Sequence, residues 1–290
     1  MTDLITRRTF SLTTAMALSA AVFQPTLFAD PDTNLTAAQV IDLIKQHLNM
    51  PWDTKTYRDT FKAGDPNTPV KGIASCFMST LDVIQKAQKQ GLNLVISHEP
   101  TFWTDADLIE PIKNDPMYKE KLAFIESNGM VVWRIHDHWH RWKPEPMTQG
   151  TERLLDWTES VNGQRIYKIP PTTLGKLAEQ VAKGLYSPSV RIIGDPNLPV
   201  SSVARGAHTL SGNIAAFAAA DVAMSSEVRE WESVEYARDL IESGAKKGMI
   251  VLSHEAGEEE GMVIFAGWMK NVTPGIRTKF ISTDDRLYMA

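Results

Sequence analysis

Three apolar segments of this chain end in the same way, with a histidine next to a carboxylate. They are NLVISHEP (93–100), VVWRIHDHWH (131–140) and MIVLSHEAGEEEG (249–261). A short apolar run is typical of a strand buried in an α/β sheet, and such sheets bind ligands beyond the carboxyl ends of their strands. Because imidazole and carboxylate groups bind metal ions, the pattern predicts an α/β protein with a metal site at its strand ends.

The order of predicted strands and helices is repeated in the two halves of the chain. In the first half, strands at 70–77, 93–97 and 130–135 alternate with helices at 79–90 and 117–128. In the second half, strands at 203–208, 221–224 and 249–253 alternate with helices at 213–220, 233–243 and 257–270. The segments LNLVISHEP and GMIVLSHEA are also alike. We therefore predict two similar three-layer α/β lobes with mixed or mostly parallel sheets, a first lobe at 30–160, a connecting region at 161–200 and a second lobe at 201–290.

The first 29 residues have the pattern of an export signal. Arg7 and Arg8 form a twin-arginine pair, an apolar run follows from Leu12 to Phe23, and small residues precede a cleavage point after Ala29. The run is short for a membrane span. We predict a Tat-type signal at 1–29, a periplasmic location and no membrane contact after its removal. A chance Arg-Arg before a Sec signal, or a retained anchor, is the alternative.

Charge and cysteine content exclude several kinds of partner and ligand. The formal net charge is −5 and no long basic run occurs, which argues against nucleic acid as a partner. The single cysteine, Cys76, excludes a disulfide within the chain and a thiolate cluster. A metal must therefore bind through nitrogen and oxygen, which suits Zn²⁺, Mn²⁺, Fe²⁺, Co²⁺ or Ni²⁺.

The candidate ligands come from the three strand ends. His98 and Glu99 follow the first strand, and His254 and Glu258 share one face if a helix begins near Glu255. The segment HDHWH is ambiguous: an extended backbone would place His136, His138 and His140 on one face and Asp137 on the other, whereas a turn would allow any of them to face inward. One histidine at a strand end is more often a structural polar group, but five of the seven histidines occupy these ends. Of the other two, His208 is a candidate supporting residue and His47 is expected on the surface.

These motifs resemble those of the Nif-three-like family (NGG-one interacting factor three), which are dinuclear-metal-centre proteins often labelled GTP cyclohydrolase I type 2 homologues. The family pattern has Ser-His-His-Pro after an early strand, Gly-Ile-x-Val-x-x-x-His-x-x-x-Asp in the middle and Gly-His-x-x-x-Glu late in the chain. The corresponding residues here are Ser97-His98-Glu99-Pro100, Gly129 to Val132 followed by His136 and His140, and Ser253-His254 with Glu258. Ser225-Ser226-Glu227 is similar to the family's Thr-Gly-Glu.

Two departures from the family pattern are reciprocal. Glu99 stands where the family has its second histidine, and His140 stands where it has aspartate. The resemblance therefore implies a ligand set of His98, Glu99, His140, His254 and Glu258, with Asp137 or His138 as alternatives to His140. It also implies two metal ions in a cleft between the lobes and a homohexamer.

Two functions are consistent with these residues. The first is a metal-dependent hydrolase of a small-molecule substrate, in which His136 or Asp137 moves a proton. No cluster of basic residues accompanies the motifs, which weakens the case for a nucleotide substrate. The alternative is a non-catalytic periplasmic metal-binding or scaffold protein, whose site would have no open position.

Overall fold

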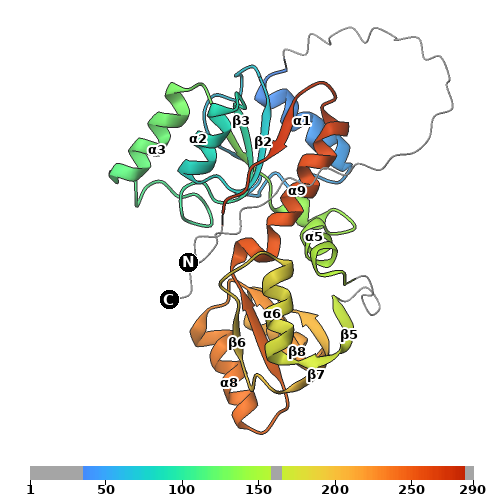
Figure 1. Cartoon of the computed structure of the whole chain (residues 1–290). Helices are drawn as coiled ribbons and strands as arrows, with labels where there is room; N and C mark the ends of the chain where they lie inside the picture. The colour runs from blue at the N-terminus through green and yellow to red at the C-terminus, as the bar shows by residue number, and fades with distance from the viewer. Residues whose placement is uncertain (1–34, 158–164, 285–290) are drawn as a thin grey trace, which may run out of the picture. The chain divides into compact units, whose positions relative to one another are not determined.

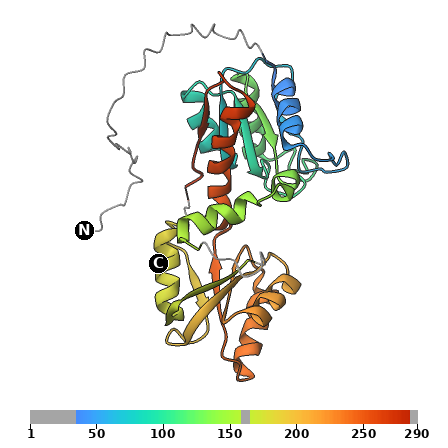
Figure 2. The same cartoon turned by 90° about the vertical axis from the view of Figure 1, so that its right-hand side faces the viewer.

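The computed structural model of the chain contains two mixed five-stranded sheets, each with helices packed on both faces (Figures 1 and 2). It describes residues 35–157 and 165–284. The predicted signal at 1–29 lies outside these residues. Among the described helices, none combines the length and the apolar composition that crossing a bilayer requires. The predicted three-layer α/β class is confirmed by this architecture.

The first sheet has the strand order β1-β4-β3-β2-β10. Its strands are β1 (Phe61–Ala63), β2 (Ile73–Met78), β3 (Leu94–Glu99), β4 (Val131–Arg134) and β10 (Thr278–Phe280). All neighbours pair in parallel except β1 and β4. One face packs on α1 (Ala37–Leu48) and α9 (His254–Val272), and the other on α2 (Leu81–Lys89) and α3 (Pro116–Ser127). The parallel β2–α2–β3 unit was predicted from the sequence.

The second sheet has the strand order β5-β7-β8-β9-β6. Its strands are β5 (Ile166–Thr173), β6 (Arg191–Ile193), β7 (Pro199–Arg205), β8 (Val222–Ser226) and β9 (Gly248–Leu252). The three central strands are parallel, and β5 and β6 are antiparallel edges. One face packs on α6 (Leu174–Gly184), and the other on α7 (Leu210–Ala219) and α8 (Glu235–Glu242), which follows the short helix η2 (Glu230–Val234).

The sheets divide the chain differently from the predicted lobe ranges. Strand β10 comes from the predicted second lobe at 201–290, yet it pairs with β2 of the first sheet. Strands β5 and β6 fall in the predicted connecting region at 161–200, yet they are the edges of the second sheet. Helix α9 joins the two: it contacts both β8 and β2, and both ribbon views show it running between the sheets. It also packs against α5 (Pro146–Leu155).

The repeated Ser-His-Glu tripeptide takes two different conformations. Ser97 to Glu99 continue strand β3, and Pro100 then prevents its preceding residue from entering a helix. In the second copy Ser253 is the N-cap of α9, and its side chain accepts a hydrogen bond from the backbone N–H of Ala256. Helix α9 therefore begins at His254, three residues before the helix predicted from the sequence at 257–270.

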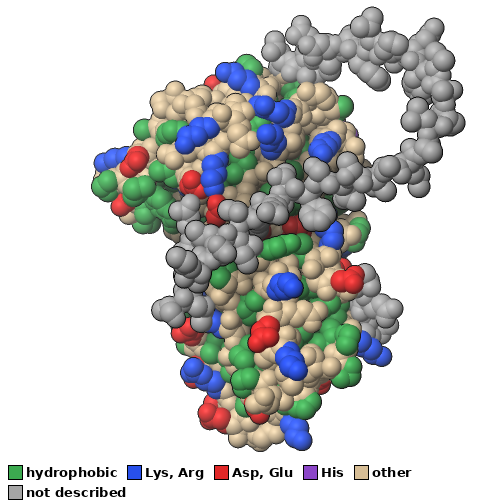
Figure 3. Space-filling view, in the orientation of Figure 1, with side chains coloured by type: hydrophobic (Ala, Val, Ile, Leu, Met, Phe, Trp, Pro, Cys, Tyr) green, Lys and Arg blue, Asp and Glu red, His purple; other side chains and the backbone are tan. Residues whose placement is uncertain are grey.

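Charged side chains are spread over the surface drawn in Figure 3. Lys and Arg side chains lie over both sheet regions of this face, and Asp and Glu side chains lie among them. The buried residues instead form separate apolar clusters on the two faces of each sheet. The central strands are mostly apolar because helices cover both of their faces, and the polar residues of β3 are Ser97, His98 and Glu99 at its carboxyl end.

Candidate metal centre

The candidate ligands are gathered at the carboxyl ends of parallel strands from both sheets. His98 and Glu99 end β3, and His136 follows β4. From the second sheet, His208 follows β7, Glu227 follows β8 and His254 follows β9. Carboxyl ends of neighbouring parallel strands lie at the same sheet edge, which is where open α/β sheets bind ligands. The candidate ligands therefore lie at the carboxyl ends of the strands, where the sequence pattern predicted them.

A first group of histidines comes from the first sheet and the turn after it. Ligand atoms of His98, His136 and His140 lie within 4.8 Å of one another. The Nε2 atoms of His98 and His140 are 3.1 Å apart. The His98 side chain is fully buried, and its Nδ1 lies 3.0 Å from the carbonyl oxygen of Ile135. This contact fixes the tautomer that leaves Nε2 available as a ligand atom.

Glu99 faces the same group with only one of its two carboxylate oxygens. Its Oε2 accepts a hydrogen bond of 2.9 Å from the fully buried Arg134, which also donates through Nε to the carbonyl oxygen of His98. Its Oε1 lies 3.5 Å from His136 Nε2 and 3.6 Å from His254 Nε2. Arg134 therefore compensates the charge of Glu99 and directs Oε1 toward the histidines.

A second group is built around the first turn of α9. His254 Nε2 lies 3.1 Å from Glu258 Oε2, so the predicted helical spacing of four residues is confirmed. His254 Nδ1 lies 3.1 Å from a carboxylate oxygen of Glu227, and these two residues form a candidate metal group with His208. Glu227 has a φ of 50°, a left-handed conformation that is uncommon for residues other than glycine.

Glu258 lies between the two groups. Its Oε2 is 3.5 Å from His98 Nε2 and its Oε1 is 3.5 Å from His208 Nε2. Burial acts to raise the pKa of Glu258, but hydrogen bonds with His208, His254 and His98 outweigh it and hold the pKa well below its usual range. Burial likewise acts to lower the pKa of His254, but the bond to Glu258 and the nearby carboxylate charges raise it to about 9.

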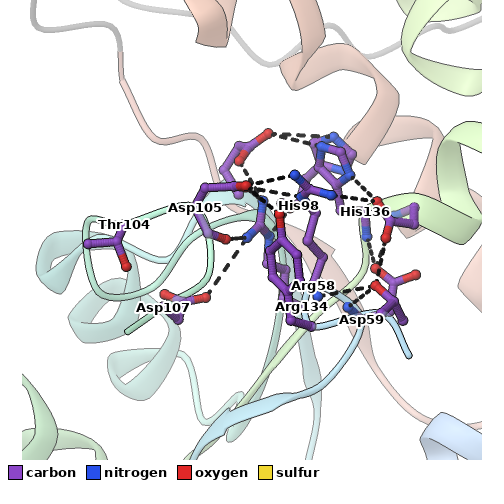
Figure 4. Close-up of polar contacts among 12 residues, drawn as sticks. Arg58, Asp59, His98, Thr104, Asp105, Asp107, Arg134 and His136 are labelled. Atoms are coloured by element: carbon purple, nitrogen blue, oxygen red, sulfur yellow. Dashed lines mark hydrogen bonds and ion pairs between the residues drawn. The ribbon is translucent and has the colours of Figure 1, made fainter. Parts of the chain in front are cut away.

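The segment HDHWH forms the short helix α4 (Asp137–Arg141) rather than an extended strand. Asp59, from the segment before β1, accepts hydrogen bonds from the backbone N–H groups of His136, Asp137 and His138. Asp59 is buried and lies beside His136 (Figure 4). Its contacts fix the turn that places His136 and His140 in one candidate metal group. None of the sequence motifs covers the segment 50–68, so no sequence pattern identified Asp59.

His138 points away from the candidate ligands. Its Nδ1 is hydrogen-bonded to Asp59, its Nε2 accepts a hydrogen bond of 2.9 Å from the backbone N–H of Asp53, and its ring stacks on Trp52. In an α-helix His138 and His140 are two positions apart and cannot face the same way. Of the three residues left open by the sequence, the structure therefore brings His140 to the site, whereas His138 is a structural residue.

Asp137 also lies behind the ligands rather than among them. Its Oδ1 is 3.0 Å from His136 Nδ1, while Thr56 and Arg58 hold its two oxygens from the other side. Burial, together with the charges of His98 and His140, lowers the pKa of His136 to about 2. His136 is therefore neutral at pH 7, with Nε2 directed to the site.

Glu145 is a further residue of the site that the sequence motifs do not identify. Its Oε1 lies 2.7 Å from His140 Nδ1, and its Oε2 accepts a hydrogen bond from the backbone N–H of Thr148 as the N-cap of α5. Burial acts to raise the pKa of Glu145, but the hydrogen bond from His140 lowers it to about 2. A carboxylate that orients a histidine in this way is typical of metal sites.

The acidic loop between β3 and α3 is tied to the residues that support the site. Arg134 Nη1 donates to the carbonyl oxygen of Asp105, and Arg58 pairs with the Asp105 carboxylate at 2.7 Å (Figure 4). Asp107 pairs with Lys62 at 3.2 Å, and both side chains are buried. The loop is thus linked, through Arg134, to the backbone of His98 and to Glu99.

The donor set suits divalent transition metals. Three groups within the described residues satisfy the spacing of a metal site, and each combines imidazole nitrogen or carboxylate oxygen atoms that converge within 4.8 Å. Their members are His98, His136 and His140; His98, Glu99 and Glu258; and His208, Glu227 and His254. Thiolate is absent from all three groups, as the cysteine count predicted. Nitrogen and oxygen donors of this kind bind Zn²⁺, Mn²⁺, Fe²⁺, Co²⁺ and Ni²⁺.

Comparison with known proteins identifies a family match over most of the chain. The family model described as Duf34/NIF3 (NGG1p interacting factor 3) matches residues 35–286. A comparison with curated proteins finds no match.

Several solved structures have a similar fold. The Staphylococcus aureus hypothetical protein SA1388 has a TM-score of 0.67 and 16% identity, and the match covers 88% of this chain and 99% of that one. The Bacillus cereus protein related to NIF3 has a TM-score of 0.68 and 14% identity, with 88% and 99% covered. Reduced HcgD from Methanocaldococcus jannaschii has a TM-score of 0.58 and 19% identity, with 87% and 98% covered. At these identities the likeness concerns the fold.

Proposed function

The chain belongs to the Duf34/NIF3 family, and we propose that it is a metal-dependent hydrolase with a dinuclear centre of divalent transition-metal ions. The family assignment agrees with the resemblance inferred from the sequence. The proposed ligands are those predicted from the motifs without His138, together with two residues that the fold adds: His98, Glu99, His140, His254, Glu258, His208 and Glu227.

The observation that carries the proposal is the position of Glu258. Its two oxygens each lie 3.5 Å from a histidine of a different group, His98 on one side and His208 on the other. Bridging by a carboxylate is the feature that a two-metal centre needs. Glu99 supports the same arrangement, because its Oε1 faces histidines of both sheets while Arg134 holds Oε2.

The roles of the remaining residues follow from their contacts. Bound divalent ions lower the pKa of a coordinated water and polarise a carbonyl or phosphoryl group. His136 lines the cavity beside the site, and its Nε2 lies 3.5 Å from Glu99 Oε1, so this nitrogen is placed to exchange a proton with a water or substrate in the cavity. Asp137 positions His136 through Nδ1 and is held by Thr56 and Arg58. We therefore assign proton transfer to His136 and positioning to Asp137.

A non-catalytic metal-binding or scaffold role is the second candidate. It is favoured by the origin of the ligands, because His98 and His140 follow strands of the first sheet whereas His208 and Glu227 follow strands of the second. Ions held by both sets would fasten the two sheets to each other. The cavity beside His136, His140 and Glu258 favours the catalytic role, because catalytic sites keep a position open to substrate.

Elemental analysis of protein purified without chelator tests the metal centre. We expect about two transition-metal ions per chain in the wild type, and their loss in the double variant His98→Ala/His254→Ala. His47→Ala is the matched control, because His47 is exposed on α1 and bonds only within that helix among the described contacts. Wild-type protein that binds no metal after reconstitution would refute the proposal.

A second experiment separates catalysis from scaffolding. Metal-loaded protein is assayed with a panel of esters, phosphate esters and cyclic amides. We expect metal-dependent turnover that His136→Ala abolishes. Because His136 is also a member of a candidate metal group, the metal content of the variant is measured alongside, and only variant protein with full metal content tests proton transfer. Metal-filled protein without turnover on the panel, but with a lower unfolding temperature after metal removal, would instead favour the scaffold.

Export and assembly complete the proposal. We propose a Tat-type signal at 1–29, a periplasmic location and a homohexamer. Cell fractionation of the wild type and of Arg7→Lys/Arg8→Lys tests export, because loss of the twin arginines should retain the protein in the cytoplasm. Light scattering coupled to size-exclusion chromatography measures the assembly, and a monomer would contradict the hexamer.

A further inference from the structure

A small cavity adjoins the candidate ligands on the side of the second sheet. Its volume is about 160 Å³. Its lining includes the site residues His136, His140, His208 and Glu258, and it also includes Arg165 and Arg205. The sequence motifs showed no basic cluster, because these two arginines lie 40 positions apart in the chain and neither is part of a motif.

The guanidinium of Arg205 is fixed and its charge is only weakly compensated. The side chain is 10% exposed. It donates to the carbonyl oxygens of Met147 and Gly257 and to the hydroxyl of Thr151, which are all neutral acceptors. The nearest carboxylate oxygen, from Glu258, is 4.0 Å away and belongs to the candidate metal ligands. A buried guanidinium whose acceptors are neutral is stabilised by a further anionic partner.

Arg165 brings a second positive charge to the same cavity. The backbone N–H of Arg205 donates to the carbonyl oxygen of Arg165 at 2.9 Å, which holds the residue before β5 against the last residue of β7. Arg165 also pairs with Glu145 at 3.4 Å, but that carboxylate is held by His140 and Thr148.

We propose that Arg165 and Arg205 bind an oxyanion group of the substrate, either a carboxylate or a phosphate, inside this cavity. The inference rests on the proposed metal centre, whose candidate ligands His140, His208 and Glu258 line the same cavity. The lining itself carries two arginines against two carboxylates, Glu145 and Glu258. Divalent ions held by the candidate ligands would add positive charge beside this lining, which would favour an anionic ligand. The volume suits a small acidic substrate rather than a complete nucleotide.

The test measures anion binding by isothermal titration calorimetry on metal-loaded protein. Sulfate represents a tetrahedral phosphate group, and acetate represents a carboxylate. We expect Arg165→Ala and Arg205→Lys each to weaken binding of the preferred anion about tenfold or more, because each removes a charge-assisted contact or its fork geometry. Arg165→Ala disturbs folding less than a change at Arg205, because the Arg165 side chain is 43% exposed. Arg238→Ala is the matched control, since Arg238 is exposed on α8 and pairs with Glu235.

The outcomes separate this inference from the metal centre. Binding that both arginine variants leave unchanged, in protein whose metal content is full, would overturn the arginine site and leave the metal centre intact. Metal-filled wild type that binds neither anion would overturn it as well. If elemental analysis finds no metal, the metal centre fails, and the arginine site stands only if the wild type still binds an anion more tightly than Arg165→Ala. A preference for sulfate or for acetate assigns the substrate class.

Discussion

Replacing Glu145 by glutamine tests the environment of His140, where this chain departs from the family pattern. The two oxygens of the carboxylate make separate contacts. Oε1 contacts His140 Nδ1 at 2.7 Å, and Oε2 accepts a hydrogen bond of 2.8 Å from the backbone N–H of Thr148, which caps α5. An amide has only one acceptor oxygen. Glutamine can therefore keep the contact with His140 or the helix cap, but not both.

Loss of either contact has a predictable magnitude. Loss of a carboxylate that orients a metal-binding histidine typically weakens metal affinity by about 10–100-fold, which is about 1.4–2.7 kcal/mol. Loss of the cap instead lowers the free energy of unfolding by about 1 kcal/mol. Glutamine carries no negative charge in either case, and the partly buried His140 contact depends on that charge more than the cap does. We therefore expect Glu145→Gln to weaken metal binding and to have a smaller effect on stability.

Chelator competition measures the metal affinity, and urea denaturation of metal-free protein measures stability. Asp115→Asn is the control, because Asp115 is the N-cap of α3 and has no contact with the candidate ligands in the described structure. It should lower stability by about 1 kcal/mol or less and leave metal affinity unchanged. Metal affinity of Glu145→Gln within twofold of the wild type would refute the assigned role of Glu145.

Three further substitutions test the supporting structure. Asp59→Asn places an amide N–H₂ opposite backbone N–H donors and His138, and should lower the free energy of unfolding by about 3 kcal/mol in urea; a loss below about 1 kcal/mol would contradict the capping role. Arg134→Met leaves the buried Glu99 charge unpaired and should cost about 3–5 kcal/mol, whereas Glu99→Gln/Arg134→Met should recover most of the loss if the two are coupled. Burial lowers the pKa of Lys121 to about 8, so the unfolded chain binds more protons than the folded one between about pH 8 and 10, and stability should rise with pH there by about 2–3 kcal/mol. Lys121→Met should remove that rise; an equal pH dependence in the variant would exclude Lys121 as its source.

Much of the fold was predictable because its central strands are buried on both faces. Apolar runs identified β2, β3, β4 and β9 with errors of one to three residues at their ends, and helices between them followed from caps and helical periodicity. The edge strands were harder, since they are short and half exposed. Strand β1 (Phe61–Ala63) is not among the predicted strands, and the pairing of β10 with β2 depends on a contact about 200 residues apart in sequence.

The candidate site was likewise predictable only in part. The motifs placed His98, Glu99, His254 and Glu258 at strand ends, and the structure brings these four together. The conformation of HDHWH could not be decided from the sequence, because both an extended strand and a helical turn fit these five residues. Asp59 decided it by accepting the backbone N–H groups of the turn, and its own segment carries no recognisable pattern.

The sequence alone determined which donor groups this protein offers to a metal, and tertiary structure decided which of them lie together. Residue types and their distance from apolar runs are local properties, so they identified nitrogen and oxygen donors, strand ends and the family. The pairings Glu99–Arg134 and His140–Glu145, and the meeting of Arg165 with Arg205, are set by packing between segments of the sheets and helices. Such contacts depend on the register and packing of whole elements, which no single segment of the sequence specifies.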